Sequence, residues 1–202
     1  NFGNSGTSMR LMMGILSAQK FSSTLIGDAS LNQRPMKRIS KPLLKMNADI
    51  KITDGKPPVY IKPVSSIRCV DHRIDVASAQ IKSSIMLAGL YGDRAFSIDT
   101  PRSRDHTEIM LSDFGCNISA DSDSIKMEPG KLISPNKIEV PGDISSAAFF
   151  IVGSIISKNS QIKIKNVGLN PLRTGLIEIL EMMGAKIEIT DQKRVNGETI
   201  GN

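Results

Sequence analysis

The chain has 202 residues, of which 40% are hydrophobic and 23% are charged, a balance that excludes wholesale disorder and allows one or two domains with their own cores. Its 26 Lys and Arg residues against 20 Asp and Glu give a net charge of +6, which suits an anionic partner, nucleic acid being only one option. Only 4% of the residues are aromatic and none is Trp, so a single-strand nucleic-acid binder built on stacked bases is disfavoured.

The hydrophobic pattern predicts an α/β protein in which helices and strands alternate along the chain. Helices are expected at 6–18, 35–46, 79–91, 106–114, 144–157 and 171–183. Strands are expected at 23–26, 59–62, 73–76, 95–98, 124–127 and 161–164. Further strands should directly follow the helices at 35–46, 106–114 and 171–183.

The order of these elements repeats. The clearest echo is the end of the second helix in each copy, where MNADIKI (46–52), FGCNISA (114–120) and MGAKIEI (183–189) are spaced by 68 and 69 residues. Each segment is predicted to be a helix end that turns into an alternating strand. Any α/β protein alternates in this way, but the matching spacing favours a true repeat with the order βαβαββ.

A domain boundary is expected near residues 134–143, a segment with two prolines and a glycine. Asp143 at its end is a good N-cap for the apolar helix that follows. Residues 1–139 should then hold two repeat units of a first domain. Residues 140–202 should hold the first unit of a second domain.

The cysteines and the apolar stretches indicate the kind of cellular compartment in which the protein works. Cys69 and Cys116 have no CxxC partner, which disfavours a disulfide framework and a structural zinc site and indicates a reducing compartment. The longest apolar stretch, residues 144–156, is interrupted by serines and is too short to span a membrane.

Groups that favour anions lie at the starts of the first two predicted helices. The segment GNSGT (3–7) offers backbone N–H groups for a phosphate or carboxylate, although a glycine turn that caps the helix is the commoner explanation. It matches neither a P-loop nor a dinucleotide fingerprint. Arg34 precedes Pro35 at the next helix start, where it could bind an anion in bidentate fashion or belong to a solvated basic turn.

Similar groups open the helices of the second copy. Ser78 can cap its helix, and Gln80 places a donor and an acceptor in the first turn of an otherwise apolar helix. Because helix starts of repeated units can converge on one cleft, we expect a ligand with several negative charges.

The segment SRDHTE (103–108) completes the set. Asp105 and Glu108 have the spacing of a capping box, which explains both carboxylates structurally. Ser103 and Arg104 are then free to meet a ligand. Asp105 and His106 could suggest acid–base chemistry, but adjacent residues rarely face each other on a helix.

Six sequence blocks resemble the 5-enolpyruvylshikimate-3-phosphate synthase family and occur in that family's order along almost the whole chain. They are GNSGTSMRLMMGIL (3–16), GDASLNQRPMKRI (27–39), SAQIKSSIMLAGL (78–90), SRDHTEIML (103–111), VPGDISSAAFFIVGSII (140–156) and NVGLNPLRTGLIEILEMMGA (166–185). RPMKR, SAQIK, SRDHTE and NPLR are similar to the variant motifs of the class II branch. A sister family that acts on UDP-N-acetylglucosamine shares the fold, but neither cysteine falls where its catalytic cysteine loop would lie.

The resemblance implies an inside-out α/β barrel fold of two similar domains, each of three βαβαββ units. It implies transfer of the enolpyruvyl group of phosphoenolpyruvate to the 5-hydroxyl of shikimate 3-phosphate, with release of phosphate, in the shikimate pathway to chorismate and aromatic amino acids. The protein would be a cytoplasmic monomer with small-molecule substrates. It would need no metal, organic cofactor, nucleic acid or membrane.

The resemblance also assigns binding residues. Phosphoenolpyruvate would be bound by Asn4, Gly6, Thr7, Arg34 and Gln80. Shikimate 3-phosphate would be bound by Ser78, Ala79, Gln80, Ser103 and Arg104. His106 stands where some relatives have a tyrosine.

The family's Lys-Ser…Arg motif and its acid–base Asp and Glu residues have no counterpart among these residues. We therefore expect an internal fragment that does not turn over substrate by itself. Three alternatives stay open: a transferase acting on UDP-N-acetylglucosamine, a non-catalytic anion-binding module, and a basic nucleic-acid binder, whose affinity would fall steeply with salt.

Overall fold

A computed structural model describes all 202 residues, which divide by their contacts into two units. Unit 1 comprises Asn1–Ser103 and Gly115–Leu132, and unit 2 comprises Arg104–Phe114 and Ile133–Asn202. None of the helices has the length and apolar character needed to cross a membrane.

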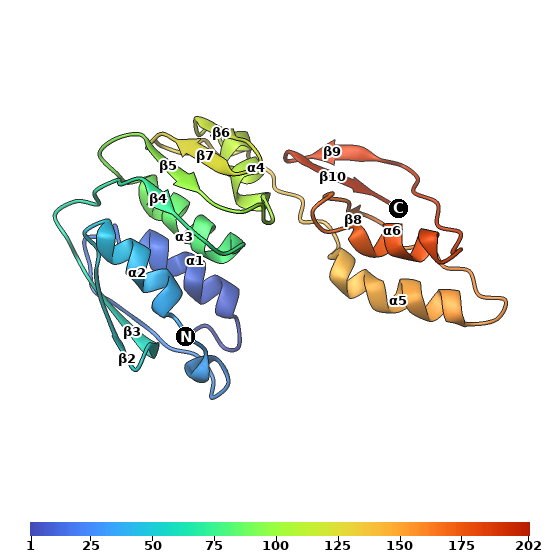
Figure 1. The fold of residues 1–202 in the computed structure, drawn as a ribbon, viewed down its shortest axis with the longest axis horizontal. Coiled ribbons are helices and arrows are strands. Elements are labelled where there is room, and N and C mark those ends of the chain that lie inside the picture. The colour runs from blue at the N-terminus through green and yellow to red at the C-terminus, as the bar shows by residue number, and fades with distance from the viewer. The chain divides into compact units, whose positions relative to one another are not determined.

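Unit 1 contains two sheets and three α-helices, which Figure 1 labels. The first sheet is antiparallel, in the order β1-β3-β2, with β1 (Ser23–Leu25), β2 (Asp49–Thr53) and β3 (Lys56–Lys62). The second sheet has the order β4-β5-β7-β6, with β4 (His72–Arg73), β5 (Phe96–Asp99), β6 (Ile118–Ala120) and β7 (Ser124–Met127). In it, β4 is parallel to β5 and the other pairs are antiparallel.

The core of unit 1 forms where α1 (Gly6–Leu16) packs along α3 (Ala79–Gly89), with α2 (Lys37–Lys45) against both. Each helix contributes side chains that are fully buried, among them Met9, Met13, Leu43, Ile85 and Met86. Burial of such side chains supplies most of the stabilisation of a helix pair. The pairing of α1 with α3 also brings their N-terminal turns within reach of each other.

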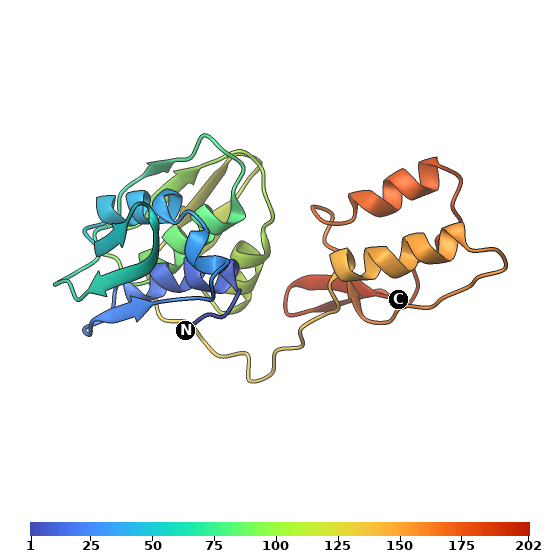
Figure 2. The same cartoon turned by 90° about the horizontal axis from the view of Figure 1, so that it is seen from below.

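Unit 2 contains α4 (His106–Asp113), α5 (Ile144–Ile156) and α6 (Gly175–Met182). Its sheet is antiparallel in the order β8-β10-β9, with β8 (Val167–Gly168), β9 (Lys193–Val195) and β10 (Glu198–Gly201). Helices α5 and α6 cover one face of this sheet (Figure 2). The buried core between the layers consists of Ile144, Ala147, Val167 and Ile177.

The strand order confirms the predicted repeat. In each copy the last strand lies between the two strands that precede it, giving β1-β3-β2, β5-β7-β6 and β8-β10-β9. The full βαβαββ order is present as β4-α3-β5-α4-β6-β7. The predicted N-cap of α5 is also confirmed, because the Asp143 carboxylate accepts a hydrogen bond from the Ser145 backbone N–H at 3.2 Å.

Two predicted strands of the third copy are wrong. Residues 161–164 and 185–189 belong to no sheet, although their isoleucines alternate as in a strand. A strand requires hydrogen bonds to a neighbouring strand, and neither segment has such a partner. The strands of this copy form later in the chain than predicted, at β8, β9 and β10.

A buried histidine makes the stability of unit 1 depend on pH. His72 in β4 is 6% exposed, and its Nε2 atom has no hydrogen-bond partner. Burial, and then the nearby charge of Lys45, lower the His72 pKa from 6.5 to about 4, and Asp71 only partly opposes this shift. The unfolded chain binds a proton at His72 more tightly than the folded chain does. The folded state is therefore not penalised by this histidine above pH 6.5, and it loses stability relative to the unfolded chain as pH falls from 6.5 toward 4.

We expect protonation of His72 to lower the free energy of unfolding by about 3 kcal/mol between pH 7 and pH 4. Replacing it in the variant His72→Gln should make the free energy of unfolding less dependent on pH over that range by about the same amount. Urea unfolding of both proteins at pH 7 and pH 4 measures the difference. Equal pH dependence in the two proteins would contradict the assignment.

Candidate anion-binding site

The N-terminal turn of α1 is the centre of the site. Ser5 caps the helix through its Oγ, which accepts a hydrogen bond from the Ser8 backbone N–H at 3.2 Å. The first turn contains no acidic residue, so the positive end of the helix dipole is not offset there. Asn4 and Thr7 are exposed on either side of Gly6, the first helical residue.

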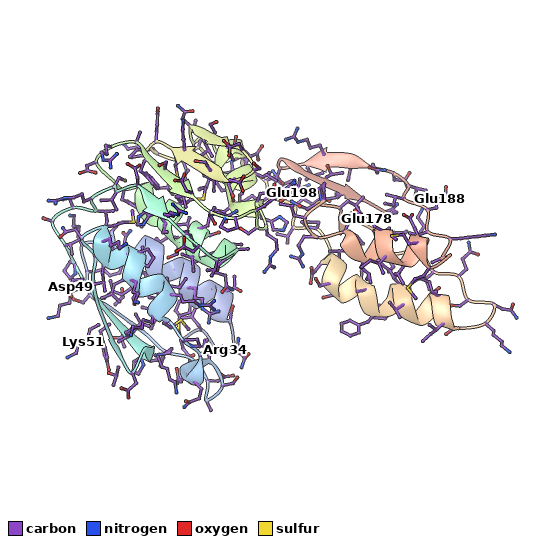
Figure 3. The ribbon with its side chains drawn as sticks, in the orientation of Figure 1. Arg34, Asp49, Lys51, Glu178, Glu188 and Glu198 are labelled. Carbon is purple, nitrogen blue, oxygen red and sulfur yellow. The ribbon has the colours of Figure 1, made fainter.

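Arg34 reaches this turn from a different position than predicted. It lies in extended backbone after the 3-10 turn Leu31–Gln33, and α2 begins only at Lys37. The Arg34 Nη2 atom donates to the Asn4 side-chain oxygen at 2.6 Å. Figure 3 labels Arg34 next to this 3-10 turn. The guanidinium is therefore held at the start of α1 with other N–H groups available for an anion.

Asp28 fixes the other end of Asn4. The Asn4 side-chain nitrogen donates to the Asp28 Oδ2 atom at 2.7 Å. The backbone N–H of Leu31, followed by the Asn4 amide, lowers the pKa of Asp28, so this exposed carboxylate stays ionised. The amide of Asn4 thus keeps one orientation, with its oxygen toward Arg34.

The first turn of α3 joins the site through Gln80. Its side-chain nitrogen donates to the Thr7 hydroxyl at 2.8 Å, and its oxygen accepts from the Arg10 Nη1 atom at 2.8 Å. Arg10 also donates from Nη2 to the Pro35 carbonyl at 3.2 Å. These bonds connect α1, α3 and the segment before α2 at one place.

Sequence reasoning missed Arg10. It lies one helical turn after Gly6 and Thr7, so the spacing of four and three residues is the signal that could have placed it on the same face. Burial, then the charges of Arg38 and Arg34, lower its pKa from the usual arginine value. The like charges indicate a region where an anion would relieve repulsion between cations.

Gly6 leaves room between two guanidinium groups. A Cβ atom at this position would lie 3.2 Å from Arg34 Nη1 and 3.3 Å from Arg10 Nη1. The structure therefore brings together the five residues assigned to one ligand, namely Asn4, Gly6, Thr7, Arg34 and Gln80. Two arginines, a helix N-terminus and a side-chain amide can bind a small phosphorylated or carboxylated molecule.

The residues assigned to the second ligand are only partly gathered. Ser78 and Ala79 are half-buried beside Gln80 at the start of α3. Ser103 follows β5 in unit 1, where its buried hydroxyl makes no hydrogen bond. Arg104 is exposed and belongs to unit 2. Ser78 occupies the predicted N-cap position of α3, but its side chain makes no capping hydrogen bond.

The predicted capping box of α4 does not form, although Asp105 occupies the N-cap position. Asp105 makes no side-chain cap bond and instead accepts from the Asn170 side-chain nitrogen at 2.7 Å. That nitrogen also donates to Glu198, and the His106 Nδ1 atom pairs with the same Glu198 carboxylate. A polar network within unit 2 thus takes the place of the local cap and occupies His106.

The chain was compared with known proteins. The family model described as EPSP synthase (3-phosphoshikimate 1-carboxyvinyltransferase) matches residues 1–200. A protein of Methylococcus capsulatus with the name 3-phosphoshikimate 1-carboxyvinyltransferase is 47% identical over 100% of this chain and 47% of its own length. A protein of the same name from Acidithiobacillus ferrooxidans is 46% identical over 99% of this chain and 46% of its own length.

A solved structure shows the same similarity to EPSP synthase. The EPSP synthase from Acinetobacter baumannii superposes with a TM-score of 0.89 and 47% sequence identity, covering 98% of this chain and 46% of that one. The chain thus spans about half the length of the relatives it matches.

Proposed function

Because the chain belongs to the EPSP synthase family, we propose that the full-length protein transfers the enolpyruvyl group of phosphoenolpyruvate to the 5-hydroxyl of shikimate 3-phosphate and releases phosphate. The observation that carries the proposal is the group of Arg34, Arg10 and Gln80 around Gly6 at the start of α1. Both substrates carry a phosphate and a carboxylate, which such donors recognise.

The site suggests how binding and catalysis are divided. Arg34 and the N-terminal turn of α1 bind the anionic groups of phosphoenolpyruvate, with Asn4 orienting the guanidinium. Addition of the hydroxyl gives a tetrahedral intermediate, and loss of phosphate completes the transfer. Fixed cationic donors favour these steps because they face negative charge without having to reorganise.

Shikimate 3-phosphate is assigned to the start of α3 and the segment before α4. Ser78 and Ala79 precede Gln80, so a ligand held there lies next to the residue that contacts Thr7. The buried hydroxyl of Ser103 has no protein partner and is available to a ligand. Arg104 is assigned to the phosphate of the same substrate.

Further assignments complete the proposal. Residues 1–139 belong to the first domain and residues 140–202 begin the second. The full-length protein acts as a monomer in the cytoplasm. The 202-residue chain by itself does not turn over substrate, because the residues that transfer protons are not among those present.

The test is a phosphate-release assay of the full-length protein with both substrates, with mass spectrometry of the product. Phosphate and 5-enolpyruvylshikimate 3-phosphate should appear together, and the 202-residue chain should release none. Phosphate release only with UDP-N-acetylglucosamine as acceptor would replace the proposed acceptor. Turnover by the 202-residue chain would refute its assigned inactivity.

Arg10 should be needed for full affinity. In the full-length protein, Arg10→Met removes the donor that holds the Gln80 oxygen, and we expect KM for phosphoenolpyruvate to rise about 10- to 100-fold. The matched control is Lys51→Met on β2, which removes an exposed cation (Figure 3) and should leave KM unchanged. Equal KM values for the two variants would show that Arg10 plays no part in binding.

A further inference from the structure

The N-terminal end of α4 is held by other parts of unit 2 rather than by its own sequence. Asp105 occupies the N-cap position and Glu108 stands three residues later, so the residues of a capping box are present. Asp105 nevertheless makes no capping bond, and its carboxylate accepts from the side chain of Asn170, 65 residues away. A local rule that is broken although its residues are available is expected where function requires a particular position of the chain.

Asn170 holds this carboxylate in one place. The residue is 4% exposed, and its side-chain oxygen accepts from the Leu172 backbone N–H at 2.8 Å, which fixes the orientation of the amide. Its side-chain nitrogen therefore faces Asp105 at 2.7 Å and Glu198 at 3.3 Å. Because one buried amide donates to two carboxylates, loss of this donor would leave both of them without it in a place that water reaches poorly.

The β9–β10 hairpin holds the same end of α4 through further contacts. Glu198 at the start of β10 pairs with the Nδ1 atom of His106, the first residue of α4. About one turn later, Ile109 packs onto the turn of the hairpin, where a Cβ atom at Gly197 would lie 2.6 Å from the Ile109 Cγ2 atom. The first turn of α4 is therefore fixed at Asp105, His106 and Ile109 by contacts that all lie within unit 2.

Arg104 takes its position from this arrangement. It directly precedes Asp105 in the chain, so one peptide unit separates it from the residue that Asn170 holds. Its own side chain is exposed and has no hydrogen-bond or ion-pair partner within the chain. A guanidinium binds a phosphate through two parallel N–H···O bonds only when its plane is correctly placed. The backbone at the start of α4 is what can place it.

We propose that Asn170 and Glu198 are positioning residues, which hold the start of α4 and thereby place Arg104 to bind the phosphate of shikimate 3-phosphate. The inference rests on the proposed function, which assigns that phosphate to Arg104. Asn170 and Glu198 do not touch the substrate themselves. They act through Asp105 and His106 on the backbone of Arg104.

A double-mutant cycle in the full-length protein tests the proposal. Asn170→Asp keeps the shape of the side chain but replaces the shared donor by a third carboxylate. We expect KM for shikimate 3-phosphate to rise about 10-fold or more, while KM for phosphoenolpyruvate changes by less than about threefold. Arg104→Met should itself raise KM for shikimate 3-phosphate. In that background Asn170→Asp should have little further effect, because no guanidinium is left to be placed.

Asn117→Asp is the matched control. It makes the same chemical change at an exposed residue of unit 1 and should leave both KM values within about twofold. Circular dichroism and urea denaturation show whether each variant folds. If Asn170→Asp fails to fold, Glu198→Gln enters the same cycle, since it removes one charge and keeps the size of the side chain.

Three results would overturn the proposal. They are an unchanged KM for shikimate 3-phosphate, an equal rise in both KM values, and an equal effect of the substitution with and without the Arg104 guanidinium. The last two would indicate a general loss of structure, which does not depend on one side chain. If the unsubstituted full-length protein does not turn over shikimate 3-phosphate, the proposed function is refuted and the inference falls with it.

Discussion

Replacing Arg34 by methionine in the full-length protein should raise KM for phosphoenolpyruvate by about 100-fold or more, since loss of a charged hydrogen-bond donor to an anion costs about 3 kcal/mol or more. Arg34 is half-buried, is oriented by Asn4 at 2.6 Å, and lies beside the position of a Gly6 side chain. Steady-state kinetics at saturating shikimate 3-phosphate measure the change.

The matched control is Arg73→Met in the same unit. The Arg73 side chain is 85% exposed and pairs only with the equally exposed Asp75, so its loss should leave KM within about twofold. Unchanged saturation by phosphoenolpyruvate in Arg34→Met would refute the assignment of this residue. An equal rise in both variants would indicate a general effect of net charge.

Sequence reasoning succeeded for elements defined by local signals. The apolar spacing of α1, α3 and α5 and the capping carboxylate of Asp143 are properties of short segments, and the structure confirms them. The repeat could also be found because its three helix-to-strand junctions have nearly equal spacing. The predictions of strands at 161–164 and 185–189 were wrong. An alternating pattern indicates which face of a segment is apolar, but it does not indicate which strand the segment would pair with.

The site was predictable to the extent that each part lies at a helix start. Asn4, Thr7 and Gln80 were found in this way, and hydrogen bonds join them to the same cluster. Arg10 was missed: its spacing from Gly6 and Thr7 could have placed it on the same helix face, but its role depends on contact with Gln80, which is 70 residues away in the sequence. The capping box of Asp105 failed for a similar reason, since Asn170 competes for the same carboxylate.

Close packing of α1 on α3 is what brings these separated residues together, and Gly14 permits it. A Cβ atom at Gly14 would lie 2.2 Å from the backbone carbonyl oxygen of the fully buried Ser84. A backbone atom cannot turn aside, so the variant Gly14→Ala must push the two helices apart. We expect a loss of about 3 kcal/mol or more in the free energy of unfolding, measured by urea denaturation.

A helical glycine of unit 2 provides the control. Gly153 in α5 has no atom within 4 Å of an added Cβ, so Gly153→Ala should stabilise its helix by up to about 1 kcal/mol through helix propensity alone. In the full-length protein Gly14→Ala should also raise KM for phosphoenolpyruvate, because Thr7 and Arg10 on α1 bind Gln80 on α3. Similar changes in the free energy of unfolding of the two variants would mean that α1 and α3 can move apart with little loss of stability. The geometry of the site would then not depend on their close contact.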